Sequence, residues 1–80
     1  MARPRASPRP ARRLRRILAE QRANGKEFNA AWPVAVAGAT VGLDRDERLA
    51  WARAFDATRQ EWEACWYRRG PALHLAIPDD

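Results

Sequence analysis

The chain has few large aliphatic side chains, and this scarcity limits the folds that it can adopt. Leu, Ile, Val and Phe together make up 13 of the 80 residues, whereas alanine accounts for 17. An aliphatic content this low is common in disordered chains. Four tryptophans argue for folding, because each can bury a large apolar area, and a net charge of +5 is too low to hold the chain open by repulsion. The sequence therefore predicts one small domain whose core depends on its tryptophans.

Apolar residues recur at three- and four-residue intervals in three stretches, which is the pattern of amphipathic helices. Glycines mark the ends of these stretches: Asn24-Gly25 ends the first, and Gly38 and Gly42 bracket the exit of the second into a loop. Eighty residues leave no room for a nucleotide-binding β/α domain or a barrel. We therefore predict an all-α fold, a small three-helix domain over residues 11–69. The expected helices cover about 11–24, 27–39 and 44–69.

The third expected helix carries the clearest signals. Asp44 and Glu47 have the spacing of a capping box, in which the aspartate accepts a hydrogen bond from the third backbone N–H of the helix. Gly70-Pro71 is a typical helix stop. One side of the helix is largely apolar, with residues spaced by four, three, four and three: Trp51, Phe55, Thr58, Trp62 and Cys65, with Trp66 alongside. This stripe is predicted to face the core.

The two ends of the chain differ from the helical stretches. Residues 1–10 contain three prolines and no acidic side chain, which predicts a disordered basic arm. The arm is not a secretory signal, because no apolar stretch follows it. Residues 70–80 are a short tail in which Leu73, Leu75 and Ile77 alternate with other residues, the period of an extended segment. We expect this tail to dock on the helices, to pair with a partner, or to stay loose.

Catalytic or metal-binding chemistry has few candidate residues. His74 is the only histidine, and it lies in the tail without an orienting partner. Cys65 is the only cysteine, so the chain can form neither an internal disulfide nor a cysteine-based zinc site. Its place on the apolar stripe predicts a core thiol, and a lone thiol fits a reducing cytoplasm. We expect no enzyme activity, no cofactor and no metal site.

Positive charge is concentrated in the first part of the chain. Residues 1–24 hold eight arginines against Glu20 alone, whereas residues 25–80 hold seven basic and nine acidic side chains. Arginines at this density can neutralise phosphates and release counterions. The leading interpretation is a small accessory or regulatory protein that binds nucleic acid non-specifically through its N-terminus. The expected contacts are Arg3, Arg5, Arg9, Arg12, Arg13, Arg15 and Arg16.

Other interpretations of the charge and the tryptophans stay open. The basic segment is also compatible with a solubilising tail shaped by GC-rich codons, an anionic membrane surface, or an acidic protein partner. The competing function is a protein–protein adaptor that docks through the Trp-rich face of the third helix, with Trp66 and Tyr67 as anchors. Homodimerisation along this helix is a further option. No transmembrane segment is expected, since the uncharged stretch 28–43 is too short to span a bilayer.

The helical part of the chain also carries a resemblance. The segment Phe28-Asn29-Ala30-Ala31-Trp32-Pro33, with the tryptophans and arginines of residues 51–69, resembles small Arg/Ala/Trp-rich helical proteins of high-GC bacteria and their mobile elements. The likeness covers about residues 12–69. It implies a helical fold and a bacterial, cytoplasmic setting. It implies no site, because no activity is assigned to that group.

Overall fold

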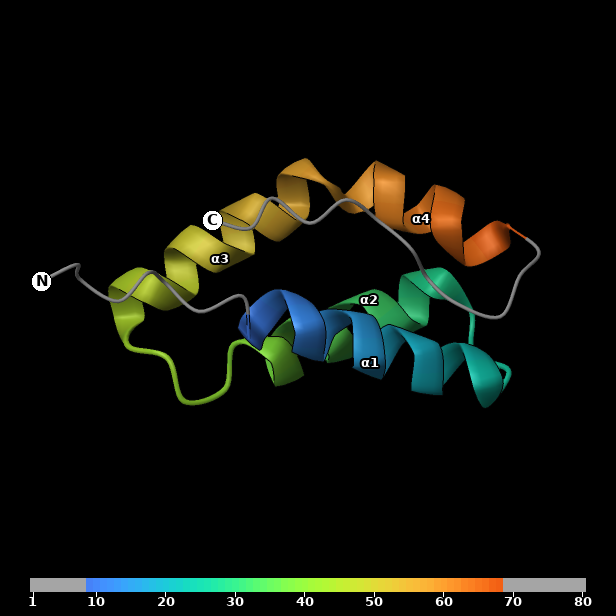
Figure 1. The fold of residues 1–80 in the computed structure, drawn as a ribbon, viewed down its shortest axis with the longest axis horizontal. Coiled ribbons are helices and arrows are strands. Elements are labelled where there is room, and N and C mark those ends of the chain that lie inside the picture. Colours follow the sequence, from blue (N-terminus) through green and yellow to red (C-terminus); the bar gives the residue numbers. More distant parts are fainter. Residues whose placement is uncertain (1–8, 69–80) are drawn as a thin grey trace, which may run out of the picture.

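The computed structural model describes residues 9–68, which form four helices (Figure 1). The helices are α1 (Arg9–Ala23), α2 (Phe28–Ala39), α3 (Arg45–Ala57) and α4 (Arg59–Tyr67). Residues 9–68 contain no strand, so the predicted all-α class is confirmed. Residues 1–8 of the expected arm, and residues 69–80 with the expected tail and His74, lie outside the described residues.

α1 and α2 form an antiparallel hairpin (Figure 1). Gly25 N–H donates to Arg22 O at 3.0 Å, which closes the turn after α1. Lys26 N–H donates to Gln21 O, also at 3.0 Å. This pair of bonds is the Schellman arrangement, which requires a left-handed residue just beyond the helix. Gly25 supplies it with a φ of 78°, so the predicted end of the first helix is confirmed.

Small residues on α2 let α1 approach closely. Ala31, Ala35 and Ala39 are fully buried. A Cβ placed on Gly38 would lie 2.6 Å from Ile17 Cδ1, so a side chain at this position would require the end of the Ile17 side chain to move. The high alanine content therefore contributes to packing by allowing close contact.

α1 begins two residues earlier than expected. Arg9 and Pro10, which were assigned to the arm, form the first turn of α1, and Pro10 is buried. Proline is accepted there because the first N–H groups of a helix have no intrahelical partner. The start of the helix therefore adds an arginine to its surface.

The expected helix over 44–69 is two helices in the structure, because the chain bends at Thr58. Thr58 has φ of −108° and ψ of 9°, and its hydroxyl donates to the carbonyl oxygens of Ala54 and Phe55, both at 3.2 Å. Bonding of this kind by a threonine side chain bends helices. α3 and α4 thus lie end to end and arch over the hairpin (Figure 1).

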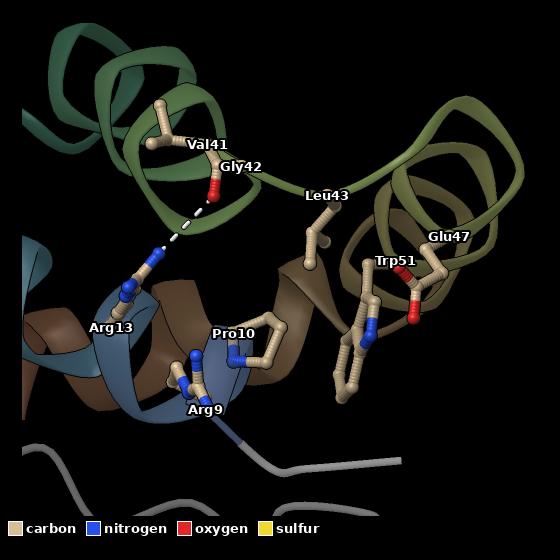
Figure 2. Close-up of a pocket in the computed structure, with 8 residues that line it drawn as sticks. All are labelled: Arg9, Pro10, Arg13, Val41, Gly42, Leu43, Glu47 and Trp51. Carbon is tan, nitrogen blue, oxygen red and sulfur yellow. Dashed lines mark hydrogen bonds between the residues drawn. The ribbon is translucent and has the colours of Figure 1, made fainter.

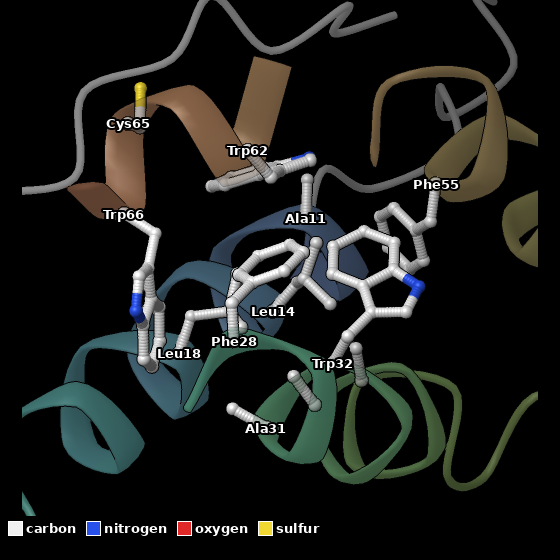
Figure 3. Close-up of a cluster of buried hydrophobic side chains, with 12 residues drawn as sticks. Ala11, Leu14, Leu18, Phe28, Ala31, Trp32, Phe55, Trp62, Cys65 and Trp66 are labelled. Carbon is white, nitrogen blue, oxygen red and sulfur yellow. The ribbon is translucent and has the colours of Figure 1, made fainter. Parts of the chain in front are cut away.

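Aromatic side chains fill the space between the arch and the hairpin (Figure 3). Phe28, at the start of α2, is fully buried, and its ring centroid lies 5.5 Å from that of Trp32 and 5.6 Å from that of Trp66. The Arg59 guanidinium carbon lies over the Phe28 ring, 5.5 Å from its centroid. The remaining core residues are Ala11, Leu14, Leu18, Ala31, Ala35, Ala39, Phe55, Trp62 and Cys65. The predicted dependence of the core on tryptophan is confirmed for three of the four, because Trp51 is only half-buried.

The predicted N-cap of α3 is present. The Asp44 carboxylate accepts a hydrogen bond from Glu47 N–H at 2.8 Å. Replacing Asp44 with alanine removes this acceptor and should lower the free energy of unfolding by about 1 kcal/mol. Replacing Asp56, which is exposed and outside any cap, should change it by less than about 0.5 kcal/mol. Urea unfolding of both variants checks this, and equal effects would contradict the role of Asp44.

Candidate nucleic-acid interface

The outward face of α1 carries the candidate interface. α1 contains six arginines, and Glu20 is its only acidic residue. Leu14 and Leu18 are fully buried toward α2. Because a helix repeats every 3.6 residues, this burial turns the positions opposite them to solvent.

Three of the expected contact arginines lie on this exposed face. Arg9, Arg12 and Arg16 are all exposed, and their spacings of three and four residues place them on neighbouring turns of one side of α1. From the first to the last is about 10 Å of helix axis. We call these three residues the α1 basic face.

The other expected contact arginines are either half-buried or outside the described residues. Arg13 is half-buried, and its Nη1 donates to Val41 O at 3.2 Å, which ties α1 to the loop after α2. Arg15 is also half-buried, and its Nε has no hydrogen-bond partner among the described residues. Arg3 and Arg5 lie outside the described residues. The structure therefore brings together part of the expected basic set.

A pocket of about 320 Å³ opens beside the α1 basic face (Figure 2). It lies between the first turns of α1, the loop after α2, and the first two turns of α3. Its lining residues are Arg9, Pro10, Arg13, Val41, Gly42, Leu43, Glu47 and Trp51. Sequence reasoning missed this pocket, because its walls come from segments more than 25 residues apart. The half-buried Trp51 at the edge of the predicted stripe was the one available signal.

The expected adaptor surface is not formed as predicted. Trp66 is 6% exposed and packs edge-to-face on Phe28, whereas Tyr67 is 67% exposed. The expectation that Trp66 lies at the surface is wrong, because a core poor in aliphatic side chains uses the indole to fill its volume. Phe55 and Trp62 on the same side are buried as well. Most of the Trp-rich face thus lies in the interior of the protein, with Trp51 half-buried at its edge.

A second, shallow groove lies between α2 and α3 and is mainly apolar. Leu49, at its rim, is 52% exposed. The groove has a volume of about 570 Å³, and its lining residues are Trp32, Pro33, Val36, Ala37, Leu49, Ala52, Arg53 and Asp56. The only acidic side chain in its lining, Asp56, sits beside Arg53, so the groove has little net charge. It offers nothing specific for a polyanion.

No protein family matches the chain, and neither does any curated protein or solved structure. The resemblance drawn from the sequence therefore stays a prediction. Within residues 9–68, no helix is long and apolar enough to cross a membrane. The same part of the chain has no cluster of three His, Cys, Asp or Glu side chains that could hold a metal ion.

Proposed function

We propose that the protein binds nucleic acid through the α1 basic face, as a small accessory or regulatory factor without enzyme activity. The observation that supports this most is the exposure of Arg9, Arg12 and Arg16 on one side of a helix. Guanidinium groups suit phosphate because they are always charged and can donate two parallel hydrogen bonds. Arg3 and Arg5 precede this helix in the sequence and are further arginines that can contact phosphates.

Binding of this kind is expected to be largely independent of base sequence. The α1 basic face consists of arginines, and contacts between arginine and phosphate carry no information about base sequence. About 10 Å of helix axis corresponds to roughly three nucleotides along one strand. The face is therefore long enough to contact several phosphates at once.

The salt dependence of affinity tests this proposal. If about five arginines contact phosphates, the log–log slope of affinity for duplex DNA against salt should be about −4 to −5. Deleting residues 2–8 removes Arg3 and Arg5 but leaves α1 whole, so the slope should become shallower by up to about 2. Fluorescence anisotropy between about 50 and 200 mM salt measures both slopes. Absence of binding to DNA and RNA at the lowest salt would contradict the proposal.

The adaptor alternative has less support than the nucleic-acid proposal. It requires an exposed Trp-rich face on the third helix, and Phe55, Trp62 and Trp66 of that face are buried within the protein itself. Tyr67 is the one expected anchor at the surface. If the protein binds no nucleic acid at low salt, the adaptor role becomes the favoured function.

A further inference from the structure

We propose that the pocket beside the α1 basic face receives an unpaired base of a single-stranded nucleic acid, with Trp51 as its stacking surface. This inference rests on the proposed function and names the class of nucleic acid that it favours. The α1 basic face would hold the phosphates of the same strand.

The pocket combines an aromatic wall with polar groups. Figure 2 shows Leu43, Pro10 and the Trp51 indole bordering a common space, with Arg9 on the α1 side and Glu47 on the α3 side. A volume of about 320 Å³ equals the space of roughly ten water molecules. This volume is large enough for one planar base.

Trp51 is placed differently from the other tryptophans. Trp32, Trp62 and Trp66 are 9%, 2% and 6% exposed and belong to the core. Trp51 is half-buried, and it packs on Phe55 with ring centroids 5.4 Å apart. That contact holds the indole while leaving part of it open to the pocket. A ring fixed in this way is a suitable platform for a base, since every base has an apolar face.

The pocket carries charges of both signs, which suits the edge of a base. The Glu47 carboxylate lines the same space as Arg9 and Arg13, and a carboxylate repels an anionic phosphate. A base edge carries both donors and acceptors, so its amino or imino group can donate to Glu47 while its carbonyl oxygen or ring nitrogen accepts from an arginine. In a duplex these edges are paired and the base faces are stacked. Entry into the pocket therefore requires a single strand.

The position of the pocket suits a strand that follows α1. Arg9 belongs both to the pocket lining and to the α1 basic face. A strand whose phosphates contact Arg12 and Arg16 can thus continue toward the pocket and place one base against Trp51. The α1 basic face, which would bind the phosphates, and the pocket, which would bind the base, are therefore adjacent on the surface.

Tryptophan emission gives a direct test. The full chain is titrated at about 50 mM salt, where electrostatic binding is strong, with a 12-nucleotide mixed-sequence DNA strand and with the same sequence as a duplex. We expect the single strand to quench tryptophan emission and to bind at least about fivefold more tightly than the duplex. Trp51→Ala should weaken single-strand binding by roughly 5- to 150-fold, the range for loss of one stacking contact. Its duplex affinity should change by less than about twofold.

Two control variants separate stacking from a structural effect. Trp51→Phe keeps an aromatic ring, so it should retain most of the single-strand affinity while the quenching disappears. Tyr67→Ala removes an exposed aromatic side chain away from the pocket and should leave both affinity and quenching unchanged. Thermal unfolding of each variant confirms that the fold is intact.

The outcomes distinguish this inference from the proposed function. Equal affinities for single strand and duplex, with no change in tryptophan emission, would overturn the base-binding pocket and leave phosphate binding by α1 standing. Quenching that persists in Trp51→Phe would also overturn it, because another tryptophan would then be the reporter. No binding of either form would overturn both proposals.

Discussion

Replacing Trp62 with alanine should lower the free energy of unfolding by about 3–5 kcal/mol, the usual cost of truncating a buried tryptophan. Trp62 belongs to α4 and is 2% exposed. Its side chain packs in the core between α4 and the hairpin, where Ala11 also lies (Figure 3). The core of a chain this small supplies only about 3–5 kcal/mol of net stability. The variant should therefore be largely unfolded at room temperature, as measured by far-UV circular dichroism and thermal melting.

Trp62→Phe provides the matched comparison. It retains a large aromatic side chain, so it should unfold cooperatively and lose less stability than the alanine variant. A Trp62→Ala protein that melts cooperatively within a few degrees of the unmodified chain would show that α4 contributes little to the core. The packing of α4 on the hairpin would then not be a main source of stability.

The helix ends that sequence reasoning predicted correctly depend on local chemistry. Asp44 reaches the N–H three residues ahead, and Gly25 adopts a left-handed φ one residue past the helix cap. Both signals act within a single turn of the chain. They could therefore be recognised without knowledge of the tertiary fold.

The break at Thr58 was not predicted, although its cause is also local. The apolar stripe continues through Thr58 with helical spacing, and this favoured a single helix over the whole segment. Hydrogen bonds from the Thr58 hydroxyl to Ala54 O and Phe55 O accompany the bend. The bend keeps aromatic residues of both α3 and α4 on the side of the hairpin (Figure 3).

The candidate site was predicted in part. Sequence reasoning identified the arginines of α1, but it could not separate exposed Arg12 and Arg16 from half-buried Arg13 and Arg15. That difference depends on how α1 is rotated against α2, which is fixed by the packing of residues such as Leu14. The pocket with Trp51 depends on the same tertiary arrangement. Neither could be read from one stretch of sequence.

The affinity of an Arg12→Gln/Arg16→Gln variant for duplex DNA at about 50 mM salt tests the central claim most directly. Both side chains are exposed, on the side of α1 opposite the buried Leu14 and Leu18, so the fold should persist. Loss of two phosphate contacts should weaken binding by roughly 10- to 200-fold at this salt concentration. The matched control is Arg45→Gln/Arg53→Gln, which removes two exposed arginines from α3 and the same net charge.

We expect a large loss of affinity for the α1 variant and a change of less than about threefold for the α3 variant, because direct phosphate contacts at the α1 basic face matter more than the net charge of the protein. Equal losses in the two variants would mean that binding follows net charge alone. Unchanged affinity in the α1 variant would contradict the account outright.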